Sequence, residues 1–287
     1  IYNPEKIPWI KKNVKFPNTM VDGIVPRLRK ENQEFIEKKT SLLDKAPILH
    51  EPYVEWYIEN NNFLKSEFFY KSNIKIVDNV GLYENIKLRF LNASHSAVSY
   101  IGLLLGYKFV HEVMEDYDCY KFIYNFMNLE VLPIVKVPKD FNKSKYINIV
   151  LERFKNPHLN DELKRISIDG SYKINIRLLD TIKDRLSDKN CSYSPFIITC
   201  WFKFLFGKDI NNNLIEINDP NKKTLLGIIN NKNNIDQIIE NFLNYKFVFD
   251  INKEDKSFLK KNIKTHLNNI NNYGLKNSII NINNSKL

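Results

Sequence analysis

A polar stripe with the residue types of a proton-transfer site lies in residues 84 to 96. On an α-helix at 100° per residue, Lys87 and His95 fall within about 80° of each other, with Glu84 in the same stripe. Asn92 lies just beside them. The rest of this helix is apolar nearly all round, and a helix of that kind is buried. Because burial penalises a charged amine, we expect the pKa of the lysine to be lowered.

These residue types suit the oxidation of an alcohol. A neutral amine can remove the hydroxyl proton as a general base while a hydride leaves the carbon for a cofactor. An amide can donate to an oxygen that develops negative charge, and an imidazole can orient the same hydroxyl or share its proton. On spacing alone, however, a helix with a snorkelling lysine and a core histidine is the commoner explanation of such a stripe.

Four stretches of the chain resemble the long-chain mannitol dehydrogenases, a family that also includes fructuronate reductases. The polar stripe carries the Lys-x4-Asn-x2-His signature from Lys87 to His95. The other three are Phe-Pro-Asn-Thr-Met-Val-Asp at 16–22, Glu-Arg-Phe-Lys-Asn-Pro at 152–157 and Arg-Ile-Ser-Ile-Asp-Gly-Ser-Tyr-Lys at 165–173. Because all four occur in the family's order, the resemblance is specific and favours function over a purely structural helix.

The resemblance implies a role for eight residues. The implied catalytic residues are the base and two groups that hydrogen-bond the reacting hydroxyl, with an acid that relays the proton to water. Three further residues are implied to bind the substrate, and one is implied to lie near the nicotinamide. They are Lys87, Asn92 and His95 for catalysis, Glu84 for the relay, Asp22, Arg165 and Lys173 for the substrate, and Val21 for the cofactor.

The substrate-binding residues also have plain structural explanations. Arg165 and Lys173 are eight residues apart, so on a continuous helix they share a face to within about 80°. Two cations on one face are usually exposed to solvent and have no binding role. Only the resemblance favours a substrate-binding role for this pair. The intervening residues 169 to 171, Asp-Gly-Ser, are expected to bend the helix. Asp22 could equally be the N-cap of a following helix.

The implied reaction is NAD(P)-dependent interconversion of a linear polyol and its ketose, with mannitol and fructose as the first choice. Fructuronate reduction is the alternative within the family, since Arg165 and Lys173 could hold a carboxylate. A non-catalytic helical binding domain is a third interpretation. It is favoured by Gly23, where the family usually has arginine, and by Asn60, where it has an acid. No metal is expected, because the histidines are dispersed.

The helical pattern predicts a mainly α fold, and the resemblance implies that it is the helical C-terminal substrate domain of a two-domain dehydrogenase. The chain has only 8 glycines and no Gly-x-Gly-x-x-Gly turn, so we expect the N-terminal Rossmann domain to be absent and the chain to be a fragment. The expected limits are 1–15 for the end of that domain or a linker, 16–275 for the helical domain and 276–287 for a low-complexity tail that frays. The helical domain should pack against its own nucleotide-binding domain.

Composition argues against nucleic-acid and membrane partners, and the resemblance implies a small sugar or polyol as the partner. The net charge is +10, but the lysines are scattered among asparagines and isoleucines without an aromatic-basic cluster, which argues against nucleic acid. No run of eighteen apolar residues occurs, so no membrane partner is expected. The chain has 3 cysteines, which suit reduced core thiols. We expect a cytoplasmic monomer that uses either NAD or NADP.

Overall fold

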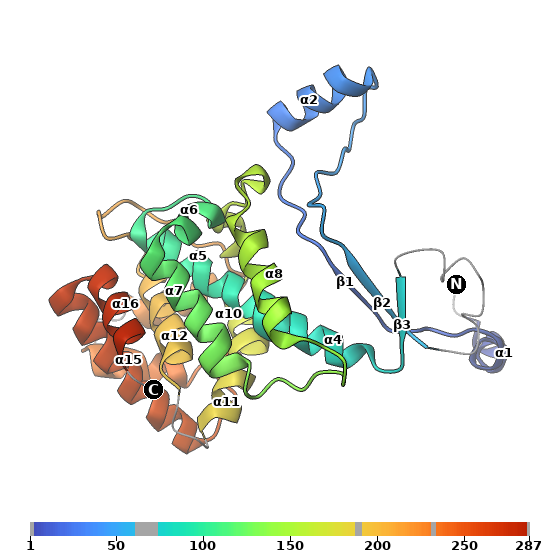
Figure 1. Ribbon diagram of the computed structural model, residues 1–287. Helices are drawn as coiled ribbons and strands as arrows, with labels where there is room; N and C mark the ends of the chain where they lie inside the picture. Colours follow the sequence, from blue (N-terminus) through green and yellow to red (C-terminus); the bar gives the residue numbers. More distant parts are fainter. Residues whose placement is uncertain (1–2, 61–73, 187–190, 231–233, 286–287) are drawn as a thin grey trace. The chain divides into compact units, whose positions relative to one another are not determined.

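The computed structural model describes residues 3–60, 74–186, 191–230 and 234–285 (Figure 1). The chain divides into two compact units, Ile1–Lys87 and Leu88–Leu287, and each is described by itself. The expected limits at 15/16 and 275/276 do not coincide with this division. Within the described ranges, no helix is both long enough and apolar enough to cross a bilayer.

The first unit is built on a three-stranded sheet in the order β1-β2-β3. Strand β1 (Thr19–Asp22) runs antiparallel to β2 (Glu55–Glu59), and β2 runs parallel to β3 (Ile74–Val77). Residues 73 to 79 alternate in part between apolar and polar, which predicts a short strand, and β3 confirms it. The helices of this unit are η1 (Pro4–Lys6), α1 (Ile7–Asn13), α2 (Lys30–Thr40) and α4 (Val80–Ile86).

The core of the first unit is small. Met20, Tyr57 and Val80 are buried together, and the rings of Tyr57 and Tyr83 stack with centroids 3.9 Å apart. Helix α2, in contrast, buries none of its residues. Residues 27 to 46 have a helical pattern that predicts inward-facing apolar residues, namely Phe35, Ile36, Leu42 and Leu43. Phe35 is 62% exposed, and Leu42 and Leu43 are exposed as well, so this prediction is wrong. The helical pattern was right, but an apolar face on a helix does not specify which element covers it.

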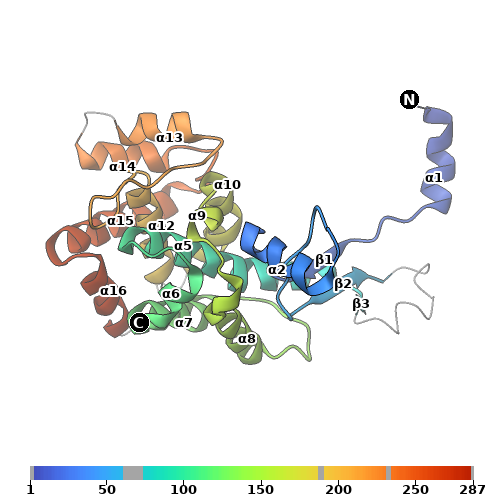
Figure 2. The same cartoon turned by 90° about the horizontal axis from the view of Figure 1, so that it is seen from above.

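The second unit is helical (Figures 1 and 2). Helices α5 and α12 pack against each other, α15 packs on α12, and α16 packs on α7 and α15. The α-helices are α5 (Ala93–Leu105), α6 (Val110–Glu115), α7 (Tyr117–Asn125), α8 (Lys143–Lys155), α9 (Leu163–Ile166), α10 (Gly170–Ile174), α11 (Asp180–Leu186), α12 (Tyr193–Phe204), α13 (Lys222–Ile229), α14 (Ile235–Leu243), α15 (Lys253–Tyr273) and α16 (Leu275–Asn284). The structure also has three π-helices, which are η2 (Lys87–Asn92), η3 (Phe126–Val131) and η5 (Asn175–Leu179). A short 3-10 helix, η4, spans Pro157–Leu159.

The α5–α12 pair forms the core, as both helices are apolar nearly all round. Residues 194 to 206 are the most apolar segment of the sequence and predict a core helix. Eleven residues of α12 are buried, which confirms that prediction. Gly102 permits close packing on α5, because a Cβ there would lie 2.5 Å from Cγ2 of Val113 and 2.6 Å from Cδ1 of Leu163. Any larger residue would push apart the helices that hold these side chains.

Helix α16 corrects the expected fraying of the C-terminal tail. Leu275, Ile279 and Ile282 are buried at a helical spacing of four and three residues. That spacing makes one apolar stripe, which is enough to dock a helix even where asparagines dominate the composition. The prediction of a frayed tail is therefore wrong as far as Asn284.

Glu130 ties the π-helix η3 to the start of α12. Its carboxylate is fully buried and accepts hydrogen bonds from the backbone N–H groups of Tyr193 and Ser194, at 2.6 and 2.9 Å. The N–H of Ser192 and the hydroxyl of Ser194 donate to it as well, each at 2.5 Å. The carboxylate thus satisfies donors at a helix N-terminus that have no partner within the helix.

Candidate functional site

The predicted polar stripe does not lie on a uniform α-helix. Helix α4 ends at Ile86, the π-helix η2 spans Lys87–Asn92, and α5 begins at Ala93. A π-helix closes i→i+5 hydrogen bonds, so the angular placement at 100° per residue is wrong through this segment. The division of the chain into two compact units falls after Lys87, so Asn92 and His95 belong to the second unit. The convergence of the three side chains stays a prediction.

In the first unit, the Lys87 amine donates to the carbonyl oxygen of Val21 at 2.5 Å. Lys87 is half-buried, whereas the apolar helix predicts a fully buried amine. The Val21 side chain is 49% exposed, and Asp22 beside it is buried at the end of β1. The next helix begins at Lys30, so Asp22 is not its N-cap. Glu84 on α4 is exposed.

Gly23 and Asn60, the two departures from the family pattern, are each accommodated by a neighbouring side chain in the first unit. A Cβ on Gly23 would lie 2.5 Å from Nε2 of His50, so the imidazole occupies the space that a side chain would need. The Asn60 amide donates to Oδ1 of Asp78 at 3.1 Å. An acid at position 60 would bring two carboxylates together, and the amide avoids that repulsion.

His95 is buried in the second unit and lies against an aromatic ring. It stacks on Phe154, with ring centroids 4.3 Å apart and an interplanar angle of 16°. Burial and then the charges of Arg177 and Arg165 hold the pKa of His95 well below its ordinary value. Its Nε2 has no hydrogen-bond partner in the part of the chain that the structure describes. A neutral imidazole with a free ring nitrogen can hydrogen-bond a hydroxyl.

Arg177 is a residue that the sequence analysis missed. Its Nη1 donates to the backbone oxygen of Asn92 and to Oγ of Ser96, at 3.1 Å each. Burial lowers the pKa of Arg177 to about 10, and its Nε has no partner within the described ranges. Arg177 thereby fixes the end of η2, where the predicted catalytic amide lies. Its position four residues after Lys173, on the same helical face, was a usable signal.

Arg165 and Lys173 do not lie on one continuous helix. Helix α9 ends at Ile166, and α10 begins after Asp169, whose φ of 60° is left-handed. The expected bend is confirmed, and the placement on one continuous helix face is wrong. Arg165 donates twice to Asp161, at 2.6 and 3.0 Å. Lys173 donates to the backbone oxygen of Ile166 at 3.0 Å.

The turn between these two helices is fixed to the core. A Cβ on Gly170 would lie 2.6 Å from both Nε1 of Trp201 and the hydroxyl of Tyr100, so the backbone lies directly against α12 and α5. Asp219 accepts from the backbone N–H and the hydroxyl of Ser171, at 2.8 and 2.7 Å. These contacts make α10 a rigid support for Lys173.

Several cationic side chains lie close enough to His95 to affect its pKa. Four cations lower its pKa, and we call them the cation cluster: Arg153, Arg165, Lys173 and Arg177. Burial, followed by the charge of Arg177, lowers the pKa of Lys173 to about 8. Cations beside a neutral imidazole can bind the hydroxyls of a sugar or hold a carboxylate. Sequence reasoning found only the pair 165 and 173, because Arg153 and Arg177 come from other helices.

Two family models match the chain. The model described as "Mannitol dehydrogenase C-terminal domain" matches residues 79–271, and the model described as "Mannitol dehydrogenase Rossmann domain" matches residues 2–71. The second match overturns the expectation that this chain lacks the Rossmann domain. The Gly-x-Gly-x-x-Gly turn marks only one strand–helix connection of such a domain, so its absence does not exclude the other parts.

Curated relatives and solved structures agree with these matches. Mannitol dehydrogenase 2 of Saccharomyces cerevisiae is 34% identical over 219 residues, covering 76% of this chain and 44% of the relative. Mannitol 2-dehydrogenase of Phaeosphaeria nodorum is 36% identical over 222 residues, covering 76% of this chain and 39% of the relative. The chain therefore spans less than half the length of these curated relatives.

A ternary complex of Pseudomonas fluorescens mannitol 2-dehydrogenase with NAD and D-mannitol superposes with a TM-score of 0.86 and 26% identity. The superposition covers 98% of this chain and 56% of that one. A substrate-free D-sorbitol dehydrogenase gives a TM-score of 0.84 at 26% identity, covering 96% and 57%. With a family model that matches residues 79–271, these findings establish that the chain belongs to the mannitol dehydrogenase family.

Proposed function

We propose that the complete protein is an NAD(P)-dependent oxidoreductase that interconverts a linear polyol and its ketose, with mannitol and fructose as the first choice. The observation that carries the proposal is the likeness, over 98% of this chain, to a mannitol 2-dehydrogenase solved with NAD and D-mannitol. The presence of lysine, asparagine and histidine at the signature positions supports it. The unpartnered Nε2 of His95, beside the cation cluster, supports it further.

In this proposal Lys87 accepts the proton of the substrate hydroxyl as the carbon loses a hydride. Asn92 donates a hydrogen bond to the same oxygen, and neutral His95 orients the hydroxyl. Glu84, one turn before Lys87 and exposed, passes the proton to water. The nicotinamide would supply the hydride acceptor. The exposed Val21 side chain offers an apolar surface that fits a nicotinamide ring.

The test is a substrate panel on the complete protein. Purified protein is incubated with mannitol, sorbitol or other linear polyols and with NAD or NADP, and formation of the reduced coenzyme is followed. We expect turnover of at least one polyol and formation of the matching ketose. Absence of turnover with every polyol and ketose, in protein that binds the coenzyme, would contradict the proposal.

Fructuronate reduction is the second candidate, and the cation cluster favours it. Arg165 is already paired with Asp161. Among the described residues, Lys173 donates only to a backbone carbonyl, and Arg177 only to an uncharged carbonyl and a hydroxyl. Asp169 and Asp219 act on Lys173 only through space, and a uronate carboxylate could bond the amine directly. Comparing kcat/KM for fructose and fructuronate separates the two candidates, because only the uronate has a carboxylate that can form charge-assisted hydrogen bonds with these cations.

If fructuronate is a substrate, its KM should rise as the pH is raised through about 8. The pKa of Lys173 is lowered to about 8, so the amine is charged below that pH and neutral above it. Loss of a charge-assisted hydrogen bond should raise KM by about tenfold or more, while KM for fructose changes little. Steady-state KM measured across pH 7–9.5 gives the result.

At every pH, the KM of the Lys173→Met variant for fructuronate should equal the raised KM that the unmodified protein has at high pH. Lys164→Met is the matched control, since Lys164 is exposed and paired with Glu216. A KM that rises with pH equally in the Lys173→Met variant would show that another group titrates.

A further inference from the structure

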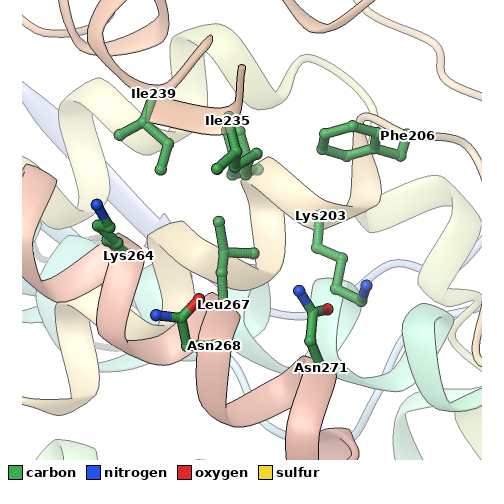
Figure 3. Close-up of a pocket in the computed structure, with 9 residues that line it drawn as sticks. Lys203, Phe206, Ile235, Ile239, Lys264, Leu267, Asn268 and Asn271 are labelled. Carbon is green, nitrogen blue, oxygen red and sulfur yellow. The ribbon is translucent and has the colours of Figure 1, made fainter. Parts of the chain in front are cut away.

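A pocket of about 330 Å³ lies among α12, α14 and α15 of the second unit (Figure 3). Three of its lining side chains are buried, namely Phe202, Ile239 and Leu267. Ile235 and Phe206 line it as well, and each is 45% exposed. None of these residues belongs to the predicted catalytic or substrate-binding set. The volume is at the lower end of the range for small-molecule sites.

Polar groups surround this apolar interior. Lys203, Lys264, Asn268 and Asn271 complete the lining. Lys264 is paired with Asp236 at 2.8 Å, so its charge is compensated. Lys203 is half-buried, and among the described residues its amine has no hydrogen-bonding or ionic partner. Figure 3 shows the Lys203 amine and the Asn271 amide on the same side of the pocket.

The two features together define the ligand chemistry. Apolar side chains in the interior favour a hydrocarbon or aromatic body, which removes Phe206 and Ile235 from water. The uncompensated charge of Lys203 favours a single anionic group at one edge, with the Asn271 amide as a second donor. A neutral apolar ligand would give the Lys203 amine no counter-charge, and a polyol would not cover the apolar side chains with apolar atoms.

We propose that this pocket binds a small amphipathic monocarboxylate, with its carboxylate at Lys203 and Asn271 and its apolar body against Phe202, Ile239 and Leu267. Roughly ten water volumes would fill the pocket, which suits a carboxylate of medium chain length. The site is separate from the cation cluster around His95 and does not depend on the proposed dehydrogenase activity.

The test is calorimetric titration of the complete protein with octanoate, octanol and octylammonium. We expect saturable binding of one octanoate, with octanol and octylammonium binding at least tenfold more weakly, because a charge-assisted hydrogen bond contributes about that factor. Lys203→Met should weaken octanoate binding about tenfold and leave octanol binding unchanged. Ile235→Trp should abolish binding of both by filling the pocket from its exposed wall.

Matched variants control for folding and for other anion sites. Lys260→Met removes a half-buried lysine of α15 that is paired with Glu240 and should change nothing. Lys173→Met should also leave octanoate binding intact, because it alters the cation cluster only. The proposal is overturned if octanoate does not bind, if octanol binds equally well, or if Lys173→Met rather than Lys203→Met weakens octanoate binding. Circular dichroism melts verify that each variant is folded.

Discussion

Replacing Lys87 by alanine is expected to lower kcat for the polyol by about 10²- to 10⁴-fold, because general-base catalysis contributes a factor of that size. KM should change much less, since the amine is proposed to act on the proton in transfer. In the described structure the Lys87 amine donates to the Val21 backbone oxygen, so it is held in place by a group that cannot take its proton. Steady-state kinetics of the complete protein give both parameters.

Lys75→Ala is the matched control for this experiment. Lys75 is also a half-exposed lysine of the first unit, paired with Glu55 at 2.5 Å, and it has no proposed catalytic role. Its kcat should stay within about twofold of the unmodified protein. A kcat for Lys87→Ala within about threefold of the unmodified protein would exclude Lys87 as the base. Equal melting temperatures of the two variants would rule out unfolding as the cause of lost activity.

The largest expected effect on stability is that of Glu130→Ala, which should lower the free energy of unfolding by about 3–5 kcal/mol. The change removes the acceptor of three backbone N–H groups and one hydroxyl at the start of α12. Those donors would then be buried without partners, in the helix that forms the core. Denaturant unfolding followed by circular dichroism measures the loss.

Glu130→Gln separates hydrogen bonding from volume, because the amide keeps the size but turns one acceptor into a donor that faces N–H groups. We expect it to be destabilising as well, though less than alanine. Glu152→Ala is the control, since that side chain is 73% exposed on α8. A loss below about 1 kcal/mol for Glu130→Ala would mean that water replaces the carboxylate.

Local patterns in the sequence predicted several helices closely. The helical pattern of residues 235–243 predicts a helix, which is α14. The pattern of residues 144–154 predicts another, which is α8 to within a residue at each end. Both have an N-cap asparagine whose side chain accepts from the backbone, and such caps are visible in the sequence. The three π-helices were missed, because one extra residue per turn is selected by packing around the helix and not by local propensity.

The candidate site also combines features that the sequence predicted with features that only tertiary packing produced. Motif spacing singled out Arg165 and Lys173, but the helix between them is broken at Asp169, so their shared position is a result of tertiary packing. Arg177 escaped notice because its partners, Asn92 and Ser96, are distant in the chain. Equally, the spacing of Leu275, Ile279 and Ile282 was present in the sequence but hidden by the asparagine-rich composition.

The sequence by itself determined the family, through residue types at fixed spacing, and it determined which helices are apolar enough to form a core. Only the tertiary structure decided the protonation of the site. His95 is held neutral by burial and by cations from separate helices, and the pKa of Lys173 is lowered by burial and by Arg177. The physical reason is that a pKa depends on the solvent and charges within a few ångströms of the group, and folding brings these together from distant parts of the chain.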